Sequence, residues 1–423
     1  MYDTDASSAP LLRGIQLKNL RRYADAEKSF REALALNAND AFALHHLAVC
    51  QFRQPGRCDD ALQTMRAAIA ADPREPEHFA MEGIILCALN QPKESLDSAD
   101  RALAIDPYCT LAFACRAQAY LQMEQWANAE TAARCALAID PDDSHAANQL
   151  AHALRLQNKE SENAVHLAGM LARNPDDAFT HANAGWAALQ SGNRKEAETH
   201  FREALRLHPD FASARAGLLH SFRARSAFYR AYLDYCFRMQ RLTKKYRWAV
   251  VIGLWGSVQI GQHALRGPHP AFWLSLVALY FILVLWTWIA KGVGNFILLF
   301  DSMVRHALYK SEKYEGIAVG GGLCVGVTLF VLGIALNLLI PVVAGAALVV
   351  AAFPFSMTFT NGSRVGSWIF GSIGFGTLAA ALFFLLQSVW PIVPVEITTE
   401  IFLASLVICL ACTWLGNIPA LKQ

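Results

Sequence analysis

The residues that could do chemistry in this chain are few, and their spacing argues against catalysis. His45 and His46 are adjacent, and on a helix their side chains would project about 100° apart, a poor arrangement for a shared metal ion. Cys409 and Cys412 form a CxxC pair inside the apolar stretch LVICLACTW, which offers no further ligand. The chain has no Gly-rich phosphate loop after a strand, no HExxH and no nucleophile elbow. We therefore expect no enzymatic activity, no metal site and no cofactor.

Charge divides the chain into three regions. Residues 1–214 carry 21 basic and 29 acidic side chains, residues 215–247 carry nine and one, and residues 248–423 carry seven and five among long apolar runs. This order is typical of a soluble module, a cationic segment and a membrane domain. The N-terminal sequence MYDTDASSAPLLRG lacks the basic and apolar regions of a secretory signal, so we expect the first region to stay in the cytosol.

The cationic segment has the composition of a lipid-binding surface. In RARSAFYRAYLDYCFRMQRLTKKYRW, basic residues alternate with aromatic ones directly before the first long apolar run. Such a segment favours anionic headgroups, by about 1 kcal/mol per cation near the surface. Nucleic acid is the alternative ligand, but the apolar neighbour and the acidic first region disfavour it. The predicted lipid contacts are Arg238, Arg241, Lys244, Lys245 and Arg247.

An internal repeat predicts the helices of the first region, residues 1–214. Five helix-like segments, AIAADP, ALAIDP, ALAIDP, MLARNP and ALRLHP, end in prolines spaced 34 residues apart, from Pro73 to Pro209. A sixth unit upstream ends in ALALNA, with Ala38 in place of the proline. Small residues recur at set positions, because only Gly or Ala lets two helices cross closely. These positions are Gly185, Ala197 and Ala204 with the bulky Phe201 in the last unit, and Gly14, Ala26 and Ala33 with Phe30 in the first.

This pattern resembles the tetratricopeptide repeat. The resemblance implies an α-solenoid of helix pairs with a concave face lined by the first helix of each pair, and an activity of binding proteins or peptides. We expect about six pairs within residues 1–214 and a capping helix that continues without a break through residues 215–247. The fifth unit departs from the pattern, since Asn163 stands where alanine is expected.

The resemblance also implies a peptide-binding groove. Amides such as Gln149 and Asn183 would donate to and accept from a peptide backbone, and Trp186 would offer a stacking face, although ordinary solvated residues would give the same pattern. Chaperone-tail binders use Lys and Asn where this chain has Leu11 and Ile15, so that partner is not expected. The acidic module favours a neutral or basic extended segment of a cytoplasmic protein. The implied groove residues are His45, His46, Met81, Ile84, Cys115, Gln118, Asn148, Gln149, His152, Asn183 and Trp186.

Residues 248–423 predict a transmembrane domain. A helix needs about 20 apolar residues to cross a bilayer, and the predicted spans are 248–265, 271–290, 317–339, 342–359, 365–387 and 401–418. Residues 295–311 carry apolar side chains at helical spacing, which predicts an amphipathic helix on the membrane surface, with packing against the repeats as the alternative. With the repeats inside, most basic residues between spans fall on the cytoplasmic side. This predicts both termini in the cytoplasm at a bacterial-type inner membrane.

The sequence as a whole predicts an all-α protein with an N-terminal repeat solenoid and a C-terminal bundle of about six spans. The favoured function is a membrane-anchored scaffold that recruits a cytoplasmic protein or peptide. The alternative is a transporter or channel component with a regulatory repeat domain, which the scarcity of charge inside the spans disfavours. Glycines within the spans indicate close helix packing, inside the chain, between copies or with other membrane subunits.

Overall fold

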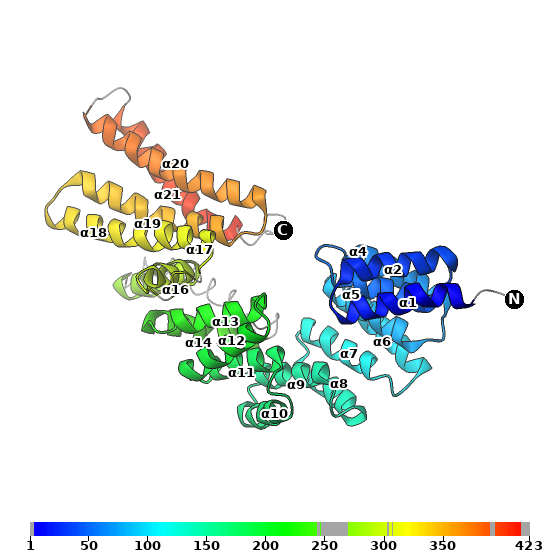
Figure 1. Cartoon of the computed structure of the whole chain (residues 1–423). Coiled ribbons are helices and arrows are strands. Elements are labelled where there is room, and N and C mark those ends of the chain that lie inside the picture. The colour runs from blue at the N-terminus through cyan, green and yellow to red at the C-terminus, as the bar shows by residue number, and fades with distance from the viewer. Residues whose placement is uncertain are drawn as a thin grey trace. The chain divides into compact units, whose positions relative to one another are not determined.

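The computed structural model describes residues 4–242, 246, 270–302, 304–306, 308–389 and 394–415. Every regular element in these ranges is a helix, which confirms the all-α class for the described part of the chain (Figure 1). The chain divides into two compact units, Met1–Arg215 and Ala216–Gln423. The division falls inside one helix.

The first unit consists of helices that pack in consecutive pairs (Figure 1). In each pair a first helix contacts the helix that follows it, and first helices of neighbouring pairs also contact one another. The pairs are α1 (Thr4–Asn19) with α2 (Tyr23–Leu36), α3 (Ala41–Phe52) with α4 (Cys58–Ala71), α5 (Pro76–Ala88) with α6 (Pro92–Ile105), α7 (Thr110–Gln122) with α8 (Trp126–Ile139), α9 (Ser144–Leu156) with α10 (Glu160–Arg173), and α11 (Ala178–Gln190) with α12 (Arg194–Leu207).

The prolines of the 34-residue series end the second helices. Helix α4 ends at Ala71, two residues before Pro73, and α12 ends at Leu207, two residues before Pro209. A proline disfavours a helical conformation in the residue before it, and Asp72 takes φ −137° and ψ 92°. Asn37, which precedes Ala38, takes nearly the same φ −139° and ψ 95°, so the repeat ends its second helix in this way without a proline as well. The repeat period predicted from the sequence is confirmed.

Close crossing within the first and last repeats depends on glycine. A Cβ atom on Gly14 would lie 2.7 Å from a ring carbon of Phe30, and one on Gly185 would lie 2.7 Å from a ring carbon of Phe201. Both phenylalanines are fully buried, so each ring packs directly on bare backbone of its partner helix. These are the small and bulky positions that the repeat pattern predicts.

The fifth repeat is packed less closely than the others. Helices α9 and α10 touch one another less extensively than the helices of any other pair. Asn163 and Met170 take the α10 positions that Ala197 and Ala204 take in α12, and their larger side chains hold the two helices apart. Asn163 is 3% exposed, and its Oδ1 has no hydrogen-bond partner.

Replacing Asn163 with alanine is expected to raise the free energy of unfolding by about 1 kcal/mol, because it removes a buried carbonyl that forms no hydrogen bond. Denaturant unfolding of the full-length protein in detergent measures this change. Asn128→Ala is the matched control, since the Asn128 amide is exposed on α8 and donates to Gln125; it should change stability by less than about 0.5 kcal/mol. A destabilised Asn163→Ala protein would show that Asn163 is satisfied.

Every regular element described in the second unit is also a helix (Figure 1). One of its elements, η1, is a π-helix, a wider turn that disrupts the regular side-chain spacing. The elements are α13 (Ala212–Arg223), which begins in the first unit, α14 (Ala227–Arg241), α16 (Pro270–Leu299), α17 (Lys310–Glu315), η1 (Gly316–Gly321), α18 (Gly322–Ala335), α19 (Leu339–Thr360), α20 (Arg364–Val389) and α21 (Val395–Leu415).

The expected continuous helix after Ala212 is interrupted. Helix α13 ends at Arg223, residues 224–226 form a turn, and α14 begins at Ala227 after the extended Ser226. The turn lets α14 fold back, so that the hydroxyl of Tyr229 lies 2.9 Å from Nδ1 of His220 and the two rings stack. Tertiary contacts made by these side chains override the uniform helical propensity of the segment.

The predicted amphipathic helix over residues 295–311 is wrong. Residues 295–299 form the end of α16, and a turn follows before α17 begins at Lys310. The new helix starts there because the Tyr309 backbone N–H donates to Glu312 Oε2 over 2.9 Å, which is half of a capping box. Val304 and Leu308 are buried against Leu219 and Phe222 of α13. Two of the apolar side chains that suggested a lipid-facing stripe therefore pack inside the second unit, whereas Phe300 is 77% exposed.

Three helical runs in the described residues are long and apolar enough to cross a membrane: Lys310–Ala335, Leu339–Thr360 and Arg364–Gln387. They correspond to the third, fourth and fifth predicted spans, and six spans are not reproduced. Helices α16 and α21 cover the second predicted span and most of the sixth, while the first, 248–265, lies outside the described residues.

Glycines bring the backbones of the second unit together. A Cβ atom on Gly345 would lie 2.5 Å from the carbonyl oxygen of Gly326, so α18 and α19 touch backbone to backbone. A Cβ atom on Gly316 would lie 2.9 Å from the backbone nitrogen of Phe296, so η1 packs directly on α16. Gly322 and Gly376 face open space instead. Small residues therefore set the helix spacing at some positions and open the surface at others.

Candidate functional site

Amide side chains on successive first helices form a row, which we call the amide row: Gln118 on α7, Asn148 and Gln149 on α9, and Asn183 on α11. Gln149 Nε2 lies 3.4 Å from Gln118 Oε1, to which it donates. Asn183 Nδ2 donates to Asn148 Oδ1 over 2.7 Å. The 34-residue period places these residues on corresponding turns of neighbouring helices, and the structure brings together the amides that the resemblance implied.

The amide row is anchored at its edge by a helix cap. Asn148 Nδ2 donates to Asp177 Oδ2 over 3.2 Å and to the carbonyl of Ser144 over 2.8 Å. Asp177 is also the N-cap of α11, where it accepts from the backbone nitrogen of Thr180. Gln149 is buried, and its Oε1 has no hydrogen-bond partner. The row is therefore preorganised, with amides held in fixed directions.

Trp186 and His152 lie on the same first helices as the row. Trp186 donates from Nε1 to the hydroxyl of Ser213 over 3.1 Å, and its ring meets Phe201 edge-on at a centroid distance of 5.4 Å. The indole is thus half-buried and already paired. Burial, and secondarily the charge of Arg155, lower the pKa of His152 to about 3, so its imidazole is neutral at physiological pH.

His45 and His46 belong to a separate histidine cluster near the N-terminus. His45 Nδ1 lies 3.0 Å from His78 Nδ1, so one ring donates and the other accepts. Burial, followed by the charges of His46, His78 and Lys18, lowers the pKa of His45 to about 3. The pKa of His46 falls to about 4 through burial and the Lys18 ammonium, which lies 3.4 Å from its Nδ1. In the described residues no three His, Cys, Asp or Glu side chains are placed to hold a metal ion.

These neutral histidines make stability depend on pH. Because the pKa values of His45, His46 and His152 in the folded protein lie below the ordinary 6.5, the unfolded chain binds protons first as pH falls. Their stabilisation is complete above about pH 6.5 and is lost progressively down to about pH 3–4. We expect up to about 2 kcal/mol of destabilisation per histidine between pH 7 and pH 5.

Unfolding of the full-length protein at pH 7 and pH 5 checks this prediction. His152→Gln cannot be protonated, so its stability should fall less between the two pH values than that of the wild type. An equal fall in both proteins would show that His152 does not contribute to the pH dependence.

Three other implied site residues are placed differently. Met81 and Cys115 are buried, and only Ile84 is half-buried. Cys115 Sγ fills the space left by the missing side chain of Gly83 and lies 3.2 Å from the hydroxyl of Ser95. Met81 packs between repeats against Ala48 and Met65. Met81 and Cys115 are therefore core residues and not part of an accessible surface.

The cationic residues are only partly described. Arg238 is exposed and Arg241 half-buried in the last turn of α14. Lys244, Lys245 and Arg247 lie outside the described residues. The two described arginines are positioned at the end of a helix, where a cation is favoured by the helix dipole.

The second unit contains a group of charges that the sequence did not reveal, which we call the buried network: Arg223, Lys291, Asn295, Glu312 and Glu315. Arg223 Nε donates to Asn295 Oδ1 over 2.9 Å, and Asn295 Nδ2 donates to Glu315 Oε2 over 2.9 Å. Arg223, Asn295 and Glu315 are 3%, 0% and 1% exposed. A single buried amide thus joins a guanidinium to a carboxylate.

Two ion pairs complete the buried network. Lys291 Nζ lies 3.4 Å from Glu315 Oε2, and Arg223 Nη2 lies 3.5 Å from Glu312 Oε1. Two cations therefore face two carboxylates, so the network is neutral overall. The network connects α13, α16 and α17. Its hydrogen-bonded partners Arg223 and Asn295 are 72 residues apart in the sequence.

A local signal for the buried network exists in the sequence. Lys291 and Asn295 are spaced i, i+4, and Glu312 and Glu315 are spaced i, i+3, so each pair shares one helix face. Both pairs lie next to predicted spans, where charged residues ordinarily mark the ends of transmembrane helices. Nothing in the sequence shows that the two faces meet at Arg223.

Comparison with known proteins agrees with the architecture of the first unit. Two family models, both described as tetratricopeptide repeat, match residues 178–211 and residues 11–76 and 54–108. Among curated protein sequences, none matches this chain significantly.

Several solved structures resemble part of the chain. A tetratricopeptide repeat protein from Parabacteroides merdae has 16% identity and a TM-score of 0.42, over 57% of this chain and 96% of its own. PilW, described as a type IV pilus biogenesis factor, has 21% identity and a TM-score of 0.43, over 51% and 99%. A thermophilic repeat protein from Thermus thermophilus has 21% identity and a TM-score of 0.34, over 51% and 98%. Such distant likenesses assign no function.

The two family models identify residues 11–108 and 178–211 of this chain as tetratricopeptide repeats. The helices after residue 211 match neither family model.

Proposed function

We propose that this protein is a membrane-anchored scaffold that recruits a cytoplasmic protein or extended peptide. The observation that carries the proposal is the combination, in one chain, of tetratricopeptide repeats with three helical runs long and apolar enough to cross a membrane. Repeat arrays act through extended binding surfaces, and apolar runs of this length act as membrane spans. The proposed location is a bacterial-type inner membrane with both termini in the cytoplasm.

The amide row supports this function. Both N–H groups of Asn148 already donate, to Ser144 and Asp177, and Asn183 donates to Asn148. Because each carboxamide oxygen has two lone pairs, the two amides keep acceptor capacity for the N–H groups of a guest backbone. The surrounding module is acidic, which favours a neutral or basic partner and disfavours nucleic acid. A binding protein of this kind needs neither catalysis nor a cofactor.

The buried network favours one alternative, a transport or channel component with a regulatory repeat domain. Buried ionisable residues near membrane spans often mark transport paths, and Glu315 lies within the run Lys310–Ala335. Solute flux in proteoliposomes that is lost in Glu315→Gln would support this alternative. The scaffold is the better proposal because each charge of the network faces an opposite charge within it, so the network is neutral overall.

Affinity purification of the full-length protein from membranes in mild detergent tests the scaffold. We expect Asn183→Ala to reduce the amount of the captured protein by about tenfold, because it removes one amide of the row and leaves Asn148 Oδ1 without that donor; tenfold corresponds to about 1.4 kcal/mol. Asn128→Ala, on an outer helix, is the matched control and should capture as the wild type does. Identical proteins in identical amounts from both variants would contradict a role for the row.

A further inference from the structure

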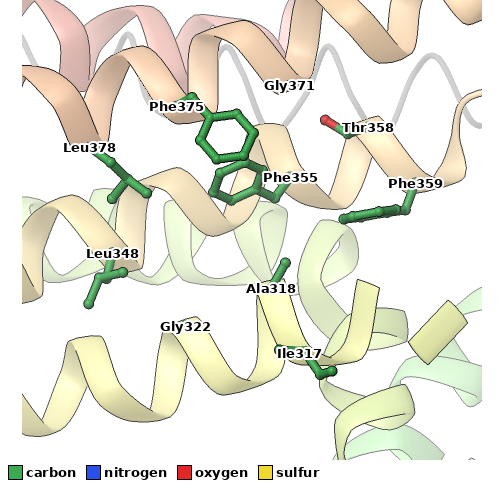
Figure 2. Close-up of a pocket in the computed structure, with 10 residues that line it drawn as sticks. All are labelled: Ile317, Ala318, Gly322, Leu348, Phe355, Thr358, Phe359, Gly371, Phe375 and Leu378. Atoms are coloured by element: carbon green, nitrogen blue, oxygen red, sulfur yellow. The ribbon is translucent and has the colours of Figure 1, made fainter. Parts of the chain in front are cut away.

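An apolar pocket opens between three helical segments of the second unit: the consecutive elements η1 and α18, helix α19, and helix α20 (Figure 2). Its volume is about 380 Å³. Small residues create it: Ala318, Gly322 and Gly371 leave space that larger side chains would fill. The pocket is lined by Ile317 and Ala318 of η1, Gly322 of α18, Leu348, Phe355, Thr358 and Phe359 of α19, and Gly371, Phe375 and Leu378 of α20.

The lining excludes polar ligands. Nine of the ten lining residues are apolar or glycine. The exception is Thr358, whose hydroxyl donates to the carbonyl of Pro354 in its own helix over 2.9 Å. A polar group entering the pocket would lose its hydration without gaining a partner, at a cost of several kcal/mol. An apolar guest would gain from burial.

The position and length of the pocket match a lipid acyl chain. Along α19 the lining runs from Leu348, near the middle of the helix, to Phe359, next to its end at Thr360. Eleven residues of helix span about 16 Å, which is close to half of a hydrocarbon core about 30 Å thick. The pocket therefore runs from one end of a candidate span to its centre, the depth of one leaflet.

Two basic residues precede lining residues of the pocket in the sequence. Lys313 of α17 precedes Ile317 of η1 by four residues, and Arg364 precedes Gly371 within α20 by seven, which corresponds to about one and two helical turns. Cations at this level attract anionic headgroups. Phe375 is 68% exposed and stands beside Phe355 at a ring-centroid distance of 5.1 Å, so an aromatic pair borders an open side (Figure 2).

From this geometry we infer that the pocket binds one acyl chain of an anionic phospholipid, whose headgroup lies near Lys313 and Arg364. The inference rests on the proposed membrane location but is independent of partner recruitment by the repeats. A neutral lipid, a second copy of the chain and bulk lipid contact are the outcomes that the test separates from it.

Two glycines of α20 give a matched pair of variants. A Cβ atom on Gly371 would lie 3.6 Å from Thr358 Cγ2, an ordinary contact, so leucine there enters the pocket without disturbing the helices. A Cβ atom on Gly376 meets nothing within 4 Å, so Gly376→Leu makes the same chemical change outside the pocket. Gly322→Leu fills the pocket from the opposite wall, where a Cβ atom also meets no neighbour.

The experiment uses full-length protein in phosphatidylcholine vesicles that contain phosphatidylglycerol with a photoactivatable group on its acyl chain. After irradiation, mass spectrometry should find labels on peptides containing Phe355, Phe359 and Phe375. Gly371→Leu and Gly322→Leu should reduce this labelling about tenfold, and Gly376→Leu should leave it unchanged. Circular dichroism of each variant confirms that it folds.

Three results would overturn the inference. Pocket labelling that does not exceed that of the exposed Leu382 and Val407 would indicate bulk lipid contact only. Equal labelling by the corresponding phosphatidylcholine probe would show that the pocket does not prefer an anionic headgroup. Crosslinks between two copies of the chain at Phe375 in place of lipid labels would show that the pocket is an interface.

Discussion

Replacing Arg223 with alanine is expected to lower the free energy of unfolding by about 3–5 kcal/mol. The guanidinium is 3% exposed and joins Asn295 to Glu312, so its removal leaves buried acceptors without their donor and buried carboxylates with one cation fewer. Breaking a buried pair from one side costs far more than the pair contributes. Thermal unfolding of the purified full-length protein in detergent measures the change.

Arg225→Ala is the matched control for Arg223→Ala. Arg225 is two residues away and pairs with Asp301 over 3.0 Å, but their side chains are 46% and 31% exposed. An exposed pair of this kind contributes about 0–1 kcal/mol. Equal effects of the two substitutions would show that the Arg223 site is hydrated and that the buried network is not a source of stability.

A double variant separates charge from packing at the same site. Arg223→Met combined with Glu312→Gln removes both members of one ion pair, so the other pair, Lys291 with Glu315, stays intact. Because a buried ionic pair can often be replaced by apolar groups at little cost, the double variant should be more stable than Arg223→Met alone. Additive losses would indicate that the two residues act independently.

Replacing Gly185 with leucine should destabilise the last repeat by at least about 3 kcal/mol. Even a Cβ atom there would lie 2.7 Å from the ring of Phe201, which is fully buried, and overpacking of such a site typically costs about 1–3 kcal/mol for smaller insertions. Denaturant unfolding followed by circular dichroism measures the loss.

Gly169→Leu is the control for Gly185→Leu, since a Cβ atom at Gly169 meets nothing within 4 Å. It should change stability by less than about 1 kcal/mol. A rescue experiment adds a second readout: Phe201→Ala in the Gly185→Leu background removes the clashing ring and should recover part of the lost stability. No recovery would show that the clash is not with Phe201.

The repeats could be predicted from the sequence because their physical cause is local and periodic. A proline stands two residues after the end of five of the six second helices, and a glycine such as Gly185 is required wherever an aromatic ring crosses it. The resemblance to the repeat family also implied that Asn148 and Asn183 belong to one groove, and the structure joins them by a hydrogen bond. It could not show that Cys115 fills the space over Gly83, since that contact depends on the side chains of two particular repeats.

The second unit was harder to predict because its decisive contacts are long-range and not periodic. The spacing of Val304 and Leu308 suggested a surface helix, yet both pack against α13. The buried network joins residues of three separate helices, and no local pattern indicates that they meet. In the sequence, the charges near the apolar runs indicated only which side of the membrane each loop faces. Their pairing depends on the fold.

Flotation of vesicles is the most direct test of the central proposal, that the repeats recruit a protein to a membrane held by the apolar helices. Full-length protein is reconstituted, mixed with the protein captured by affinity purification, and centrifuged in a density gradient. We predict that the wild type and Asn128→Ala carry that protein to the vesicle layer, and that Asn183→Ala floats without it. Failure of the full-length protein itself to float, or equal recruitment by Asn183→Ala and the wild type, would contradict the account.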